Sequence, residues 1–260
     1  MSRIEDVFKN LGGKKAFIPF ITCGYPDMEG FKQLAFKLAE NGADIIEIGL
    51  PFSDPLADGP MIQKTSKIAL KAGVNTDIML KAVAGLEETG IPLVVMSYFN
   101  PIYRYGVGRF LGECTKAGIK GLIIPDLPLE EACAYRDLFN DYGLDNIMMV
   151  SLTTSRKRMA LISRIATGFV YCVSVRGVTG SKTGLLDELK SFLGQVKSEF
   201  RIPAALGFGL SSVDQINQIK GFADGIIIGS KILSIIDQEP ELDQGLDRVA
   251  EFCRAVRKSL

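Results

Sequence analysis

Short apolar segments alternate with amphipathic segments along the whole chain, and a glycine often stands between them. The junctions at 41–48 and 117–124 show this unit most clearly, with looser versions at 142–149 and 222–228. A left-handed glycine is a common helix end. Strands that are apolar throughout, without alternation, are typical of a parallel sheet covered on both faces. The pattern therefore predicts repeated helix–strand units.

Counting these units gives eight expected strands, near 16–22, 45–49, 93–97, 121–125, 147–151, 169–173, 203–207 and 225–228. Segments whose apolar residues recur at helical spacing lie between these strands. In one of them, a single face is formed by Leu185, Leu186, Leu189, Phe192, Leu193 and Val196. Eight such repeats in 260 residues predict an α/β fold, a single (β/α)8 TIM barrel. A doubly wound open sheet is the rival, but it more often uses fewer strands at this length.

Two further features concern the organisation of the chain. Ile4, Val7, Phe8 and Leu11 predict an extra helix before the first strand, placed to cap the N-terminal face of the barrel. No Ser/Gly-rich linker or run of charge divides the sequence, so we expect one domain over residues 1–260.

Composition narrows the class of protein. Thirty basic and thirty acidic residues leave no net charge and no Lys/Arg block, which disfavours nucleic-acid binding. The apolar runs are too short to cross a membrane, and residues 1–6 lack the apolar core of a secretory signal. The five cysteines are scattered without a Cys-x-x-Cys pair, as free thiols of a reducing compartment would be. We therefore expect a cytoplasmic protein.

The chain contains no histidine, which limits the chemistry it can perform. Ser-His-Asp and Cys-His nucleophiles and histidine-based metal sites are excluded, and we expect no metal. Acid–base work falls to Asp, Glu, Lys, Tyr or Cys.

Glu47 is the strongest candidate for such work, because it is the one charge in the apolar strand 45–49. An ionisable group on a buried strand costs several kcal/mol unless it is paired or neutralised. Asp58, in the Gly/Pro-rich loop that follows, is a candidate partner. On the strand alone, a carboxylate satisfied by backbone amides is an equal alternative. Tyr171, in the sixth strand, would in isolation be an ordinary core aromatic.

Glycines near the end of the chain indicate a phosphate site. Gly209 follows the seventh strand, and Gly229 and Ser230 follow the eighth at the start of a helix. Backbone N–H groups and a helix N-terminus at these positions commonly bind phosphate in barrels. Gly180, in the long Gly-rich loop 174–184 that is typical of a lid, would add another amide. A phosphorylated small substrate over a carboxylate pair suits isomerisation, aldol cleavage or lyase chemistry.

The segment Pro51-Phe-Ser-Asp-Pro-Leu-Ala-Asp-Gly-Pro60 resembles the signature of the tryptophan synthase α chain family. Segments 17–26, 98–102, 125–128, 173–180 and 207–209 also resemble that family, in the same order over essentially the whole chain. The resemblance implies a TIM barrel that cleaves indole-3-glycerol phosphate to indole and glyceraldehyde 3-phosphate, in the last steps of L-tryptophan biosynthesis. It implies that Glu47 is the general acid at indole C3, that Asp58 stabilises charge at the indole nitrogen, and that Tyr171 orients Glu47.

The resemblance also implies the remaining site residues. Phosphate would be held by Gly180, Gly209, Gly229 and Ser230; the indole pocket and lid would comprise Phe20, Ile62, Met96, Tyr98, Thr179 and Phe208. Arg176 in the lid, and Ser151-Leu152 at the end of the fifth strand, depart from the family pattern.

A partner is implied as well. The family works with a β chain in an α2β2 heterotetramer, and that chain carries pyridoxal phosphate, so no cofactor is expected on this one. The contact face would include Asp54, Pro55 and Asn100. Two other functions stay open at this point: a regulatory subunit that only activates the β chain, and another phosphate-binding barrel of tryptophan or histidine biosynthesis.

Overall fold

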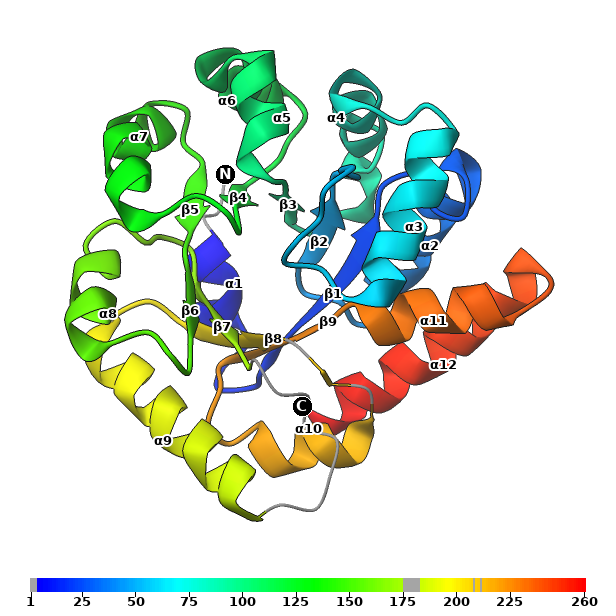
Figure 1. Ribbon diagram of the computed structural model, residues 1–260. Helices are drawn as coiled ribbons and strands as arrows, with labels where there is room; N and C mark the ends of the chain where they lie inside the picture. Colours follow the sequence, from blue (N-terminus) through cyan, green and yellow to red (C-terminus); the bar gives the residue numbers. More distant parts are fainter. Residues whose placement is uncertain (1–3, 175–182, 208, 211) are drawn as a thin grey trace.

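The computed structural model describes residues 4–174, 183–207, 209–210 and 212–260 (Figure 1). Its strands are β1 (Ala16–Thr22), β2 (Ile46–Gly49), β3 (Leu93–Met96), β4 (Gly121–Ile123), β5 (Asp145–Ile147), β6 (Met149–Ser151), β7 (Val170–Val173), β8 (Ala204–Gly207) and β9 (Gly225–Ile228). Its α-helices are α1 (Ile4–Asn10), α2 (Met28–Glu40), α3 (Pro60–Lys71), α4 (Thr76–Ala84), α5 (Phe99–Tyr105), α6 (Val107–Lys116), α7 (Leu129–Asp141), α8 (Arg156–Ile162), α9 (Thr183–Glu199), α10 (Val213–Ile219), α11 (Ser230–Gln238) and α12 (Leu242–Ser259), with a 3-10 helix η1 (Glu87–Thr89).

All the described strands form one parallel sheet in the order β5-β4-β3-β2-β1-β9-β8-β7-β6. The sheet closes on itself because its two outer strands follow each other directly in the chain. Met148 alone separates β5, which pairs with β4, from β6, which pairs with β7. The result is a barrel surrounded by a ring of helices (Figure 1). The predicted TIM barrel is therefore confirmed.

The expected strands match the observed ones closely, except for the fifth. Residues 147–151 were expected as one strand, whereas the structure has two short strands that begin two residues earlier. Asp145 and Asn146 are polar yet buried, and their contacts are non-local: the Asp145 carboxylate accepts the Ile4 backbone N–H at 3.3 Å, and the Asn146 N–H is donated to the Thr167 hydroxyl at 2.8 Å. A purely hydrophobic criterion excludes such residues from a strand.

Helix α1 lies under the N-terminal end of the barrel, as expected. Ile4 is fully buried, and its Cδ1 approaches the first residue of β4. Phe8 packs on Phe169, with ring centroids 5.9 Å apart, and also against Gly225 at the start of β9. These contacts close one end of the barrel with apolar side chains, which leaves the opposite end for a site.

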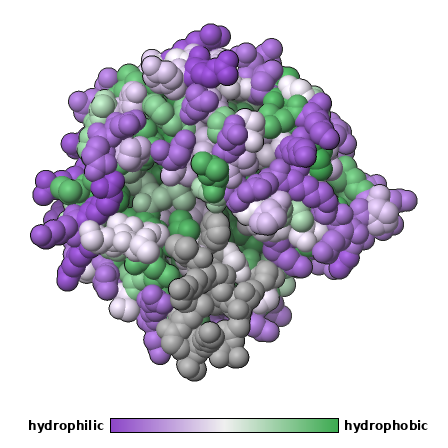
Figure 2. Space-filling model, viewed as in Figure 1, coloured by the Kyte–Doolittle hydropathy of each residue, from purple (hydrophilic) through white to green (hydrophobic). Residues whose placement is uncertain are grey.

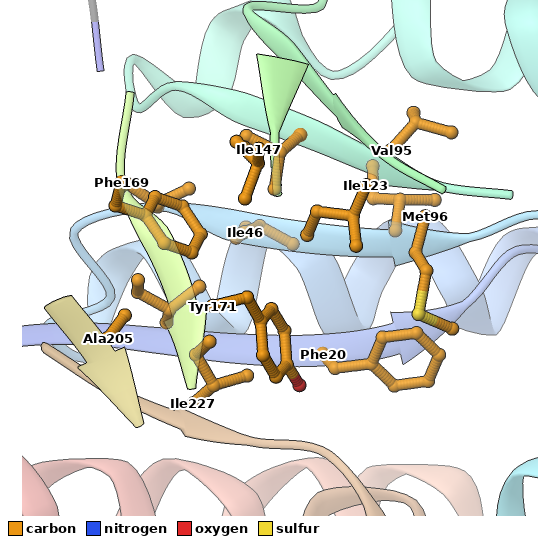
Figure 3. Packing of buried hydrophobic residues seen from close by; sticks show 14 of the residues in the cluster. Phe20, Ile46, Val95, Met96, Ile123, Ile147, Phe169, Tyr171, Ala205 and Ile227 are labelled. Atoms are coloured by element: carbon orange, nitrogen blue, oxygen red, sulfur yellow. The ribbon is translucent and has the colours of Figure 1, made fainter. Parts of the chain in front are cut away.

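The core fills the barrel interior and the layer between strands and helices. Close packing inside the barrel involves Phe169 and Tyr171 of one side and Phe20 and Met96 of the other (Figure 3). Within the described residues, no helix is both long and apolar enough to cross a membrane.

Candidate active site

A cavity of about 420 Å³ opens among the C-terminal ends of the strands and the segments that follow them. Nine of the residues singled out from the sequence line it: Phe20, Glu47, Asp58, Ile62, Met96, Tyr171, Gly209, Gly229 and Ser230. Residues from β1, β2, β3, β7 and β9 are thus brought together with the start of α11. Apolar groups show near the middle of the barrel face within a hydrophilic surround (Figure 2).

Glu47 lies on the cavity wall but is almost completely shielded from solvent. Its residue is 1% exposed, and neither carboxylate oxygen has a hydrogen-bond partner within the described part of the chain. Burial raises the pKa of the carboxyl from 4.5 to about 8, and the nearby Asp58 carboxylate adds to the rise. At neutral pH the Glu47 carboxyl is therefore mostly protonated, which is the state needed in a general acid.

Asp58 lies in the loop that follows β2, and its environment differs from that of Glu47. Burial raises the pKa of its carboxyl to about 6, and a hydrogen bond from the Tyr98 hydroxyl opposes that rise. The same hydroxyl accepts the Ala57 backbone N–H at 2.8 Å, so Tyr98 is tied to two consecutive residues of the loop. Asp58 is mostly ionised at pH 7. Two neighbouring carboxyls with separated pKa values can perform two roles in one reaction.

Tyr98 is not among the residues that line the cavity. It is buried behind the loop, where its ring stacks on Phe52 with centroids 5.1 Å apart. In this position it supports Asp58, and it does not form the part of the pocket wall that was expected from the sequence.

Tyr171 and Phe20 fill the interior because three strand-end glycines leave room for them. A Cβ at Gly207 would lie 2.5 Å from Cε1 of Tyr171, and a Cβ at Gly49 would lie 2.6 Å from Cζ of Phe20. One at Gly229 would lie 3.0 Å from Cδ1 of Phe20. The ring of Tyr171 points across the barrel toward Phe20 (Figure 3). Burial, followed by the charges of Glu47 and Asp58, raises the pKa of Tyr171 well above its usual value, so it remains a neutral phenol.

The glycine-rich end of the cavity has the features of an anion site. Gly209 has a φ of +77°, a left-handed conformation that side chains other than glycine adopt rarely. Gly229 precedes α11, whose N-terminus faces the cavity through Ser230 and Lys231. The first N–H groups of a helix have no partner within the helix and carry partial positive charge. These residues can therefore hold a phosphate.

Seven other residues line the cavity but were not predicted as site residues: Ala57, Gly59, Pro125, Met149, Leu210, Ile227 and Lys231. Pro125 follows β4, so the rule that barrel sites gather at strand C-termini is a usable signal for it. Met149 is the first residue of β6, and that rule does not indicate it. Lys231 stands next to Ser230 in the sequence, but its neighbours there gave no reason to single it out.

Several predicted residues lie outside the described residues: Gly180, Thr179 and Phe208 of the proposed substrate site, and Arg176. The other departure, Ser151-Leu152, has a local explanation. The Ser151 backbone N–H is donated to the Thr154 hydroxyl at 3.0 Å, and the Ser151 and Thr153 hydroxyls lie 2.9 Å apart. These bonds order the turn after β6.

The residues expected at a partner face lie on the surface beside the cavity. Asp54 and Asn100 are exposed, and Pro55 is half-buried. The Ser53 hydroxyl donates to the Asp54 carboxylate at 2.6 Å, which helps to shape the loop. Nearby, Leu56 is 95% exposed and Tyr103 is 65% exposed, unusually high fractions for large apolar or aromatic side chains.

The fold and the cavity define this chain as a (β/α)8-barrel protein that has a buried carboxyl, a second carboxylate and a helix N-terminus at the C-terminal mouth of the barrel. A family model described as tryptophan synthase alpha chain matches residues 8–260. The chain belongs to the tryptophan synthase alpha chain family, which confirms the resemblance seen in the sequence.

Individual relatives are similar to this chain over essentially its full length. The tryptophan synthase alpha chain of Dehalococcoides mccartyi is 45% identical, with 100% of both chains covered. That of Petrotoga mobilis is 41% identical, with 99% of both covered. The crystal structure of tryptophan synthase subunit alpha from Legionella pneumophila has a TM-score of 0.91 at 34% identity, covering 100% of this chain and 98% of that one. A structure of Mycobacterium tuberculosis tryptophan synthase gives 0.89 at 35% identity, covering 99% and 98%.

Proposed function

We propose that this chain cleaves indole-3-glycerol phosphate to indole and glyceraldehyde 3-phosphate, as the α subunit of tryptophan synthase. The observation that carries the proposal is Glu47, a fully buried carboxyl with a pKa of about 8 on the wall of a mostly apolar cavity. Family membership supplies the substrate, and the chemistry of the cavity suits it. The apolar residues of the cavity would contact the flat indole ring of the substrate, and the N-terminus of α11 would contact its phosphate.

The first step is a proton transfer. The neutral Glu47 carboxyl donates its proton to indole C3, which breaks the aromaticity of the five-membered ring and leaves an indolenine. Positive charge then develops at the ring nitrogen, and the Asp58 carboxylate accepts the N–H and stabilises that charge. Phe20, Ile62 and Met96 exclude water from the ring and keep Glu47 protonated until it reacts.

The second step is carbon–carbon cleavage. The Glu47 carboxylate, now charged in an apolar site, takes the proton from the glycerol hydroxyl next to the ring. The electrons of that O–H bond form the aldehyde carbonyl, and those of the C–C bond restore the aromatic indole. Glu47 is thereby reprotonated and ready for the next cycle. Tyr171 stays neutral throughout and positions the Glu47 carboxyl.

Phosphate recognition anchors the other end of the substrate. In the described residues, Gly209, Gly229 and Ser230 are the proposed ligands, with Gly180 and Thr179 proposed on the sequence pattern alone. The backbone N–H groups hold the anion in the same way in the substrate and the transition state. They orient the glycerol chain so that its hydroxyl lies within reach of Glu47.

The proposed partner is a tryptophan synthase β chain, in an α2β2 assembly. Asp54, Pro55 and Asn100 would contact it, and the exposure of Leu56 and Tyr103 in the same region supports this face. Pyridoxal phosphate would belong to the β chain, and neither step above is routed through it. The chain would act as a single barrel domain in the cytoplasm, where its free cysteines remain reduced.

The test is indole formation from indole-3-glycerol phosphate by the purified chain, with and without its cognate β chain. We expect indole release from the chain alone and a faster rate in the complex. A chain that forms no indole in either condition, yet accelerates the β-chain reaction from free indole and serine, would be a regulatory subunit, and the proposed activity would be wrong.

A further inference from the structure

Lys231 is the second residue of α11 and contributes to the lining of the active-site cavity beside Gly229 and Ser230. Its residue is half-buried. Within the described part of the chain, no carboxylate or other acceptor forms an ion pair or hydrogen bond with its ammonium group. A lysine that is partly withdrawn from water and lacks a protein partner is available to a ligand.

The position is also electrostatically unfavourable for a lysine unless an anion binds there. The N-terminus of a helix carries partial positive charge, so a cation in the first turn is repelled. The first turn of α11 contains no acidic residue that would offset this repulsion. A bound phosphate would reverse the sign of the interaction, because it attracts both the helix N-terminus and the lysine.

A second observation indicates that this cavity is suited to a ligand. Glu47, on β2 and lining the same cavity, is 1% exposed and has no hydrogen-bond partner among the described residues. A buried polar group without a partner is costly, and such groups concentrate where a substrate completes the bonding. The cavity is therefore suited to a molecule with two polar groups, one for Glu47 and one for the start of α11.

We propose that the ammonium group of Lys231 binds the substrate's phosphate, together with the N–H groups of Gly229 and Ser230. The inference rests on the proposed function and deepens it by naming a charged ligand for the phosphate. Side chains of a helix tilt toward its N-terminus, so a lysine at the second position extends past the first turn, toward the anion that the N–H groups hold. The helix thus presents one full charge in addition to its dipole.

A contact between Lys231 and the phosphate should affect substrate binding and not the rate of the chemical steps. The phosphate does not react, so its contact with Lys231 is equally strong in the ground state and the transition state. Removing it should raise KM and leave kcat nearly unchanged. Charge-assisted hydrogen bonds are about twice as strong as neutral ones, so the loss should be on the order of 10-fold in affinity.

The test compares Lys231→Met, Lys231→Arg and a matched control, Lys157→Met. Lys157 is also the second residue of a helix, α8, but it is exposed and lies outside the cavity. Titration with glycerol 3-phosphate, followed by NMR, should show a dissociation constant about 10-fold higher for Lys231→Met. Lys231→Arg, which keeps the charge, should restore most of the affinity, and Lys157→Met should match the wild type.

Kinetics with indole-3-glycerol phosphate provide the second readout. We expect about a 10-fold higher KM for Lys231→Met, with kcat within about 2-fold of the wild type. Equal dissociation constants for Lys231→Met and the wild type would overturn the proposal, and so would an equal loss in Lys157→Met. The titration needs no turnover, so it tests Lys231 even if the wild type forms no indole; that separate result would refute the proposed function.

Discussion

Replacing Glu47 by glutamine should stabilise the folded protein, and the gain should grow as pH rises. The pKa of this carboxyl is about 8 in the folded protein, against 4.5 when it is exposed to water. The folded state therefore binds the proton more tightly than the unfolded state. The stability linked to this proton is fully present below pH 4.5 and is lost as pH rises toward 8. Glutamine does not titrate, so the variant escapes this loss.

The size of the effect follows from the two pKa values. Each pKa unit corresponds to about 1.4 kcal/mol, so between about pH 5 and pH 8 the wild type should lose about 3 to 4 kcal/mol relative to Glu47→Gln. For a chain of 260 residues this corresponds to a relative shift in Tm on the order of 10 °C. Asp58 titrates in both proteins, so its own contribution largely cancels in the difference.

The assay is urea unfolding of both proteins at half-unit steps from about pH 5 to pH 8.5. Glu88→Gln is the matched control, because it makes the same substitution at an exposed glutamate outside the cavity. The control should follow the wild type at every pH. A constant difference between Glu47→Gln and the wild type over the whole range would refute the reasoning, since it would mean that Glu47 titrates normally.

Three further predictions concern the same site. The dependence of kcat/KM for indole formation on pH should be bell-shaped, with limbs near pH 6 and pH 8, because Asp58 must be ionised and Glu47 protonated. A kcat/KM that is flat over this range would contradict those assignments. Tyr98→Phe should move the acid limb of this pH profile to higher pH, because it removes the hydrogen bond that lowers the pKa of Asp58. An acid limb at the same pH as in the wild type would show that the hydrogen bond does not affect Asp58. Gly207→Ala should lower the free energy of unfolding by about 1–3 kcal/mol in urea titrations, because the new Cβ would collide with Tyr171; unchanged stability would mean that the ring relocates freely.

Most of the barrel could be predicted from the sequence because its strands are continuously apolar. Strand β1 was expected over its whole length, and the others to within one or two residues apart from the fifth. The fifth strand was incomplete because Asp145 and Asn146 are polar, and what buries them is contact with Ile4 and Thr167. Such partners are set by the closed barrel and leave no local signal.

Part of the candidate site could also be predicted from the sequence. Glu47 was detectable because a charge in an apolar strand is locally anomalous. The role of Tyr98 was not, because its hydroxyl reaches Ala57 and Asp58 across 40 residues of sequence and only the fold brings them together. The space that Gly49 and Gly207 leave for Phe20 and Tyr171 is likewise a property of packing between strands.

The most direct test of the central claim is the rate of indole release from indole-3-glycerol phosphate by Glu47→Gln, measured with the β chain present and with folding verified by circular dichroism. Glutamine keeps the shape of the side chain but can neither donate nor recover the proton. General acid–base catalysis contributes about 10²- to 10⁴-fold, and Glu47 acts in both steps, so we predict a loss at the upper end of that range or beyond. A folded Glu47→Gln protein that releases indole at a rate near that of the wild type would contradict the account.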